Sequence, residues 1–179
     1  MTVLDLAIRP FAAADLPAMQ QVRQAAFAPI FRSFRQIVGE AIFPIAFAEA
    51  DAEQARLLDS LCGAGSGHEV RVATLGGAVV GFVSFRIDAR KQTGEIGLNA
   101  VHPDHAGRGI GTALYEDVLA RMRARGVAVV EVSTGGDPSH APARRAYAKA
   151  GFGPAISSVT LLQAALTPGA SGKCSLLDL

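Results

Sequence analysis

Residues 102–111 read HPDHAGRGIG, a short stretch with three glycines, two histidines and an arginine. An apolar run typical of a strand precedes this stretch and a helical pattern follows it, so it leads into a helix N-terminus. There, unpaired backbone N–H groups and the helix dipole favour an anion. Gly107, Gly109 and Gly111 leave room for a phosphate to approach the backbone. The stretch therefore indicates a phosphate-binding loop, and its alternative is a tight turn from strand to helix.

Two common phosphate-binding patterns do not fit these letters. A P-loop ends in Gly-Lys-Ser/Thr, whereas Gly111 is followed by Thr112 and Ala113. A dinucleotide fingerprint needs a further glycine or alanine three positions after its second glycine. Counted from either glycine pair, a threonine or a leucine stands there instead. Nucleotide binding in the Rossmann manner is therefore disfavoured.

Two segments together resemble the GNAT family of N-acetyltransferases. VHPDHAGRGIGTAL, residues 101–114, is similar to the family's acetyl-CoA loop, whose pattern is Gln/Arg-x-x-Gly-x-Gly/Ala. HAPARRAYAKAGF, residues 140–152, is similar to its second motif: an Asn, an Ala three residues later, a Tyr four further on, and then Gly-Phe. The order of expected elements agrees from residue 3 to about residue 164. The chain departs at two positions, because Ala106 stands in place of the Gln/Arg and His140 in place of the Asn.

The resemblance implies that acetyl-CoA is the co-substrate. It places the pyrophosphate on the backbone of residues 107–112, and it lets the pantetheine arm pair with residues 99–101 like an extra strand. The residue at position 140 would contact the pantetheine amide. The implied cofactor-binding residues are Asn99, Ala100, Val101, Gly107, Arg108, Gly109, Ile110, Gly111, Thr112 and His140.

Acetyl transfer to an ammonium group with a pKa of about 10.4 needs a base, directly or through water. Glu95 is the first candidate, because its position resembles that of the base in the histone-acetylating branch of the family. We expect it on the strand face that also carries Gly97, Asn99 and Val101. Glu131, on the next strand, is the second candidate, because its position resembles the base of the ribosomal-protein-acetylating branch. The alternative for each is a carboxylate that only forms salt bridges or faces solvent.

Tyr147 stands at the family's tyrosine position, and its phenol is suited to protonate the departing thiolate. The alternative is an aromatic ring packed in the core. By the same resemblance, a backbone N–H near Val101 would stabilise the developing oxyanion. The implied function is acetyl transfer to a primary amine by direct attack in a ternary complex. A domain that binds CoA without catalysis, as a sensor or structural module, is the other function kept open.

Composition narrows the remaining function classes. The 179 residues carry a net charge of +1, which gives no basic field for nucleic acid. Cys62 and Cys174 have no C-x-x-C spacing and no ligand cluster, which fits a reducing compartment without a disulfide or metal role. His102 and His105 have no further metal-ligating residue at a useful spacing, so we expect no metal site there. With neither a signal-peptide pattern nor an apolar stretch of about 18 residues, we expect a cytoplasmic protein that does not enter membranes.

Apolar spacing, caps and turn residues predict the elements that position these side chains. The expected strands are 3–10, 68–75, 78–87, 94–101, 127–133 and 155–166. The expected helices are 13–27, 29–48 with a break near Pro44, 49–61, 110–126 and 141–152. Helix 110–126 presents an apolar stripe of Ile110, Leu114, Val118 and Met122. The fold class is α/β, a mixed and mostly antiparallel sheet flanked by helices, in one domain over 1–179 with residues 167–179 as a loose tail.

Five of the nine phenylalanines fall within one segment, residues 27–47. The resemblance implies that helices in this part of the chain cover the substrate side. These rings therefore line the acceptor pocket, form part of the core, or make the face of a homodimer, and the sequence leaves the three open. They are Phe27, Phe31, Phe34, Phe43 and Phe47.

Overall fold

The structure, a computed structural model, describes residues 5–164. Its sheet has five strands in the order β1-β2-β3-β4-β5. The first four are antiparallel neighbours, and β5 runs parallel to β4. This confirms the predicted mixed, mostly antiparallel sheet. The strands are β1 (Leu6–Pro10), β2 (Glu69–Leu75), β3 (Ala78–Asp88), β4 (Thr93–Val101) and β5 (Val129–Val132).

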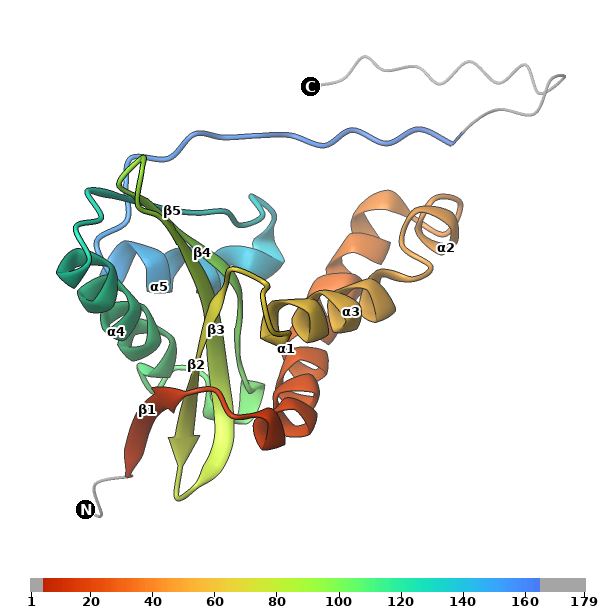
Figure 1. Cartoon of the computed structure of the whole chain (residues 1–179). Coiled ribbons are helices and arrows are strands. Elements are labelled where there is room, and N and C mark those ends of the chain that lie inside the picture. The colour runs from red at the N-terminus through yellow and green to blue at the C-terminus, as the bar shows by residue number, and fades with distance from the viewer. Residues whose placement is uncertain (1–4, 165–179) are drawn as a thin grey trace, which may run out of the picture.

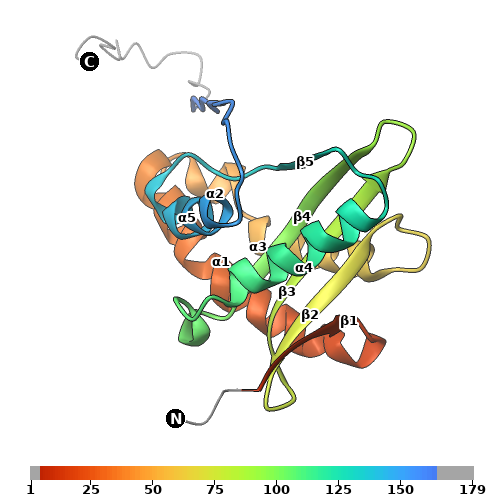
Figure 2. The ribbon, with the colours of Figure 1, turned by 90° about the vertical axis from the view of Figure 1, so that its left-hand side faces the viewer.

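Helices cover both faces of the sheet (Figure 1). On one face, α4 (Ile110–Ala124) lies diagonally across the strands with α5 (Ala141–Lys149) beside it, as Figure 2 shows. On the other face lie α1 (Leu16–Val38) and α3 (Ala50–Cys62), with the short α2 (Phe43–Ala46) next to them. Three single 3₁₀ turns precede α1, α4 and α5: Ala13–Asp15, Pro103–His105 and Pro138–His140. Within residues 5–164, none of the helices combines the length and the apolar character needed to cross a membrane.

Each helical layer buries its own apolar cluster against the sheet. The predicted stripe of α4 is confirmed, since Ile110, Leu114, Val118 and Met122 are each at most 2% exposed. They pack with Val83, Phe85 and Ile96 of the sheet. On the opposite face, Met19, Val22 and Leu58 pack with Val72, Phe82 and Ala100. The side of the sheet on which a strand residue lies can therefore be decided from its cluster.

The front helices differ from the prediction. Helices 13–27 and 29–48 were expected to be separate, but α1 continues through Pro29 to Val38. Proline removes one helical hydrogen bond and often ends a helix. Here the turns on both sides of it are held by other contacts, including those of Phe31 and Phe34 with neighbouring aromatic rings. The break comes at Gly39, and Pro44 lies in the first turn of α2 instead of ending a helix.

The last predicted strand, 155–166, is wrong over the residues that the structure describes. Residues 152–164 form an extended segment without strand pairing. Ile156, Val159 and Leu161 are 100%, 81% and 89% exposed. Strand propensity gives a strand only where a partner edge is in contact, and this segment meets none between residues 5 and 164. The tail predicted for residues 167–179, with Cys174, lies outside the described residues.

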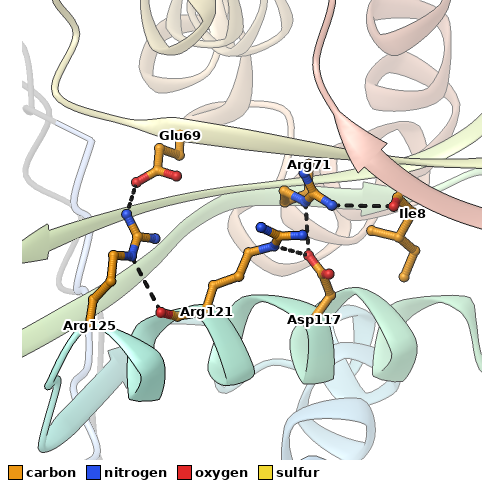
Figure 3. Close-up of polar contacts among 6 residues, drawn as sticks. All are labelled: Ile8, Glu69, Arg71, Asp117, Arg121 and Arg125. Carbon is orange, nitrogen blue, oxygen red and sulfur yellow. Dashed lines mark hydrogen bonds and ion pairs between the residues drawn. The ribbon is translucent and has the colours of Figure 1, made fainter.

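A network of charged side chains fastens α4 to β2 (Figure 3). Arg71 of β2 is only 5% exposed, and its Nε donates to Asp117 Oδ2 of α4 at 2.8 Å. Arg121 Nε donates to the same oxygen at 3.0 Å. One turn later, Arg125 forms an exposed ion pair with Glu69 of β2. These contacts fix how α4 lies on the sheet, and therefore where the loop before its first turn is held.

Candidate active site

The strands β4 and β5 run side by side along only half of β4. Their parallel ladder pairs residues 93–96 with residues 129–132 and ends there. Asn99, Ala100 and Val101 remain paired with β3 on their other side, but have no β5 partner in the described part of the chain. An open strand edge can bind an extended ligand through backbone hydrogen bonds. The three residues expected to hold the pantetheine arm therefore lie along such an edge.

The glycine-rich loop joins the end of β4 to the first turn of α4. Gly107 and Gly109 have φ values of +74° and +80°, which favour glycine, and a Cβ at either position would meet no atom within 4 Å. Gly109 is the N-cap residue and has no side chain with which to cap the helix. The N–H groups of Ile110, Gly111 and Thr112 have no acceptor within the helix. Together with the exposed Arg108, this first turn fits an anionic group such as a pyrophosphate.

The loop and the open edge adjoin each other. A Cβ placed on Gly111 would lie 3.8 Å from Val101 Cγ2, an ordinary contact distance. Thus the two halves of the predicted cofactor site, residues 99–101 and 107–112, meet at the end of β4, although residues 102–106 separate them in the sequence.

Two tyrosines and an asparagine form a buried polar group beside this edge. Tyr115 Oη donates to Asn99 Oδ1 at 2.8 Å, and Asn99 Nδ2 lies 3.0 Å from Tyr147 Oη. The rings of Tyr115 and Tyr147 lie with centroids 4.9 Å apart. The two residues are 5% and 6% exposed. The structure thus brings together Asn99 and Tyr147, two residues singled out in the sequence, from β4 and α5.

Both phenols stay protonated at neutral pH. Burial raises the pKa of Tyr147, while hydrogen bonds with Asn99 and Tyr115 oppose that rise. Burial also raises the pKa of Tyr115, and the neighbouring Tyr147 adds to the effect. Tyr147 therefore keeps its hydroxyl hydrogen at neutral pH and can donate it in a hydrogen bond to a negatively charged group at the open edge, such as a thiolate.

Glu95 does not share a face with Asn99 and Val101, and this part of the expectation is wrong. Along β3, residues 83 and 85 are two apart, but their partners on β4, Asn99 and Ile96, are three apart. One extra residue in β4 makes a β-bulge, which reverses the alternation of side chains beyond it. Ile96 packs under α4, and so do the groups around Asn99, whereas Glu95 points to the α1 and α3 side.

Glu95 and Glu131 are cross-strand neighbours on that side. They are paired in the parallel register, and Val130 and Val132 on either side of Glu131 pack toward α4. Arg86 Nε donates to Glu95 Oε2 at 2.6 Å. The two carboxylates line an open cleft of about 470 Å³ together with Arg86, Asp88 and Lys91. Both predicted bases thus share one charged cleft, four or more residues along β4 from Asn99.

His140 is held at the N-terminus of α5 by its own loop. Its Nδ1 lies 2.5 Å from Asp137 Oδ2. Burial opposes ionisation of Asp137, but hydrogen bonds with Ser139 and His140 outweigh it and hold the pKa of Asp137 below its ordinary value. Arg144 Nη1 donates to the Asp137 carbonyl at 2.8 Å, which fixes the loop. With Nδ1 engaged, Nε2 is the nitrogen left to contact a ligand.

The phenylalanine segment forms a chain of contacting rings. Phe34 lies at its centre, 5.4 Å from Phe47 and 6.5 Å from Phe31 between ring centroids, and it also stacks on His140 at 6.0 Å. All five rings are only half-buried, so they are not part of the fully buried core. Phe27 packs against the buried cluster around Met19 and Val22 and so belongs to the edge of the core. For the other four rings the acceptor pocket and a dimer face remain as alternatives. The rings in contact are Phe27, Phe31, Phe34, Phe43 and Phe47.

The sequence matches a known protein family. A model of the acetyltransferase (GNAT) family matches residues 32–152. The chain belongs to the GNAT acetyltransferase family. This confirms the resemblance found in the two sequence motifs, and the fold agrees with that of solved GNAT structures. Among curated proteins, none matches the sequence significantly.

Three solved structures illustrate the shared GNAT fold. The PaiA N-acetyltransferase of Thermoplasma acidophilum, solved with coenzyme A, has a TM-score of 0.66 and 17% identity, over 86% of this chain and 93% of that chain. The ribosomal-protein-S18-alanine N-acetyltransferase of Escherichia coli has a TM-score of 0.61 and 22% identity, over 84% of this chain and 79% of that chain. A GNAT acetyltransferase of Brucella melitensis, solved with acetyl-CoA, has a TM-score of 0.57 and 23% identity, over 86% of this chain and 92% of that chain.

Sequence reasoning missed three residues of this candidate site. Tyr115 was passed over, although a tyrosine beside the apolar stripe of α4 is a signal, because a buried phenol usually has a polar partner. Asp137 stands three residues before His140, a spacing that allows contact in a helical turn. Arg86 lies opposite Glu95 only because of the pairing register of β3 and β4, which the sequence alone did not supply.

Proposed function

We propose that this GNAT protein transfers the acetyl group of acetyl-CoA directly to a primary amine while both substrates are bound. When bound, acetyl-CoA supplies an acetyl group activated as a thioester. The observation that carries the proposal is one juxtaposition: the protonated phenol of Tyr147 is hydrogen-bonded to Asn99, on the open edge of β4. Family membership and neighbours solved with CoA or acetyl-CoA support the choice of co-substrate.

In this proposal the backbone does most of the cofactor binding. The N–H groups of residues 107–112 donate to the pyrophosphate, and the Arg108 side chain adds positive charge. The open edge at residues 99–101 pairs with the pantetheine arm in the manner of an added strand. The free nitrogen of His140 donates to, or accepts from, the pantetheine amide. These contacts hold the thioester beside Tyr147.

Glu95 is proposed as the base that prepares the amine, with Glu131 as the alternative. Both lie in the charged cleft on the α1 and α3 side of the sheet, so an ammonium group can bind there and lose a proton to a carboxylate. Their distance along β4 from Asn99 favours proton transfer through water. A backbone N–H near Val101 then stabilises negative charge on the acetyl oxygen.

The decisive experiment measures acetyl transfer from purified protein. Free thiol released from acetyl-CoA is followed with a panel of amines, and mass spectrometry checks that the amine gains an acetyl group. The panel contains peptide amino termini, lysine, a polyamine and an aminoglycoside. It includes a peptide with N-terminal alanine, because one structural neighbour acts on the alanine of ribosomal protein S18. Binding of acetyl-CoA without transfer to any member would instead favour a non-catalytic CoA-binding module.

A further inference from the structure

We propose that Tyr115 acts through Asn99 to keep the hydroxyl hydrogen of Tyr147 free for the sulfur of CoA. Tyr115 is thus a positioning residue, and Tyr147 is the group that touches the reacting atoms. The inference rests on the proposed function only in giving Tyr147 the role of acid.

The orientation of the Asn99 amide is fixed by its neighbours. Asn99 Nδ2 donates to the Gly97 carbonyl oxygen at 2.8 Å. A carbonyl oxygen only accepts hydrogen bonds, so the nitrogen of the amide must face it. The bulge in β4 helps here, because Gly97 has no Cα partner in either neighbouring ladder. The amide oxygen then faces Tyr115, which donates to it at 2.8 Å.

This orientation decides what is left for Tyr147. The second hydrogen on Asn99 Nδ2 points to Tyr147 Oη at 3.0 Å, so the phenol oxygen accepts. Its own hydrogen has one acceptor within the group, Asn99 Oδ1, at the longer distance of 3.3 Å. That oxygen already accepts the shorter bond from Tyr115. An amide oxygen can accept two hydrogen bonds, but the bond from Tyr115 is the shorter, so the bond from Tyr147 is the weaker of the two. The Tyr147 hydrogen can therefore leave Asn99 Oδ1 for a base at the open edge of β4.

The proton balance of the step is simple. When the carbon–sulfur bond of the thioester breaks, its electron pair goes to sulfur. The O–H bond of Tyr147 breaks and an S–H bond forms, which leaves a phenolate. Asn99 Nδ2 is already aimed at that oxygen and stabilises the negative charge. Solvent then returns a proton to Tyr147, and the group is restored.

A double-mutant cycle tests the coupling. Tyr147→Phe should lower kcat by at least about tenfold, because the donor is deleted while the ring remains. Tyr115→Phe removes the competing donor, so the Tyr147 hydrogen should bind Asn99 Oδ1 more tightly, and kcat should fall by about threefold to tenfold, the usual range for one hydrogen bond. Acetyl-CoA affinity should stay unchanged in both. In the Tyr147→Phe background, Tyr115→Phe should have no further effect.

A merely structural role for Tyr115 would give a different pattern. Tyr115→Phe would then lower kcat by the same factor with and without the Tyr147 hydroxyl, and this result would overturn the inference. An unchanged kcat in Tyr115→Phe would overturn it as well. Asn99→Asp is a second variant. It replaces the Nδ2 donor by an acceptor for the Tyr147 hydrogen, so it should lower kcat more than Tyr115→Phe does.

A second readout needs no acceptor amine. The thiol pKa of CoA bound to the protein is measured from thiolate absorbance as the pH is varied. A hydrogen bond from Tyr147 should lower this pKa in the wild type, and the lowering should be lost in Tyr147→Phe and reduced in Tyr115→Phe. Equal values in wild type and Tyr115→Phe would contradict the inference. The charged side chains of the two helices packed on this face are unchanged in these variants: Glu116, Asp117, Arg121 and Arg123 of α4, and Arg144, Arg145 and Lys149 of α5.

The two readouts separate the inference from the proposed function. If CoA binds and the thiol pKa follows the predicted order, but no amine is acetylated, the proposed function fails and the positioning role stands. If acetyl transfer occurs and the cycle is additive, only the positioning role fails. If the wild type does not bind CoA, both are wrong.

Discussion

Arg71 on β2 and Asp117 on α4 form an ion pair in which the guanidinium is almost completely buried. Arg71 Nε lies 2.8 Å from Asp117 Oδ2, and the Arg71 side chain is 6% exposed. The pair joins the sheet to the helix whose first turn belongs to the candidate cofactor site. Its integrity therefore bears on stability directly, and on the site through the placement of α4.

Asp117→Asn should destabilise the protein strongly. The substitution keeps the size of the side chain but leaves the buried Arg71 charge without its carboxylate, a loss of about 3–5 kcal/mol. Urea unfolding at neutral pH measures the free energy of unfolding. The matched control is Glu69→Gln, which breaks the exposed pair with Arg125 and should cost about 1 kcal/mol or less. Equal losses in the two variants would show that burial of the Arg71 charge is not what matters.

Asp15 should make the protein less stable in acid. Its carboxylate accepts hydrogen bonds from both terminal nitrogens of Arg9, each at 2.7 Å. These bonds hold the pKa of Asp15 below its ordinary value, although burial acts to raise it. A lowered pKa in the folded state gives stability that is present above the ordinary carboxyl range of about 4 and is lost as the pH falls through the folded value. Asp15→Asn should therefore be less stable than wild type at neutral pH.

The difference between Asp15→Asn and wild type should shrink as the pH falls below about 4. Thermal melting across that range measures it. A gap that stays constant into acid would mean that Asp15 acts through packing or through its bond to the Ala12 N–H and not through its charge.

Gly109→Glu should abolish or strongly weaken binding of acetyl-CoA, because it adds a side chain and a negative charge at the N-terminus of α4. Isothermal titration calorimetry gives the Kd. Gly126→Glu is the matched control: Gly126 also has a left-handed φ, +77°, but it follows the opposite end of α4. It carries the same backbone strain and the same charge, and should bind acetyl-CoA normally. Loss of binding in both variants would point to a general effect on α4.

Glu95→Gln should lower kcat by about a hundredfold to ten-thousandfold if Glu95 is the base, and should flatten the acidic limb of the pH profile. Glu131→Gln should have a smaller effect. Asp88→Asn, which changes a carboxylate of the same cleft that binds Lys91, serves as the control and should leave kcat close to wild type. If Glu131→Gln gives the large loss and Glu95→Gln does not, the two roles must be exchanged.

Much of the fold could be predicted from local patterns. The stripe on α4 repeats every four residues, and burial of one helix face is enough to produce that spacing. The hairpin between β2 and β3 is marked by adjacent glycines between two β-branched runs. In both places, the residues that determine the structure are close together in the sequence, so the pattern carries the information.

The side of the sheet on which Glu95 lies could not be predicted in the same way. Alternation assigns Glu95 and Asn99 to one face, because they are four residues apart on one strand. The bulge between Ile96 and Asn99 depends on pairing with β3, a contact between separate segments. The same is true of α1, because contacts of the aromatic rings in its second half outweigh the local effect of Pro29. It is also true of residues 155–164, whose strand propensity is not satisfied because no neighbouring strand in the described residues pairs with them.

The contact between Tyr115 and Tyr147 also gives the protein an unusual optical property. The chain has two tyrosines and no tryptophan, and the two phenol rings are the pair whose centroids lie 4.9 Å apart. Almost all near-ultraviolet fluorescence therefore arises from a single pair of chromophores beside the candidate cofactor site. Arrival of a ligand at the β4 edge can be followed from this natural emission without a label, and each Tyr→Phe variant leaves one emitter to observe alone.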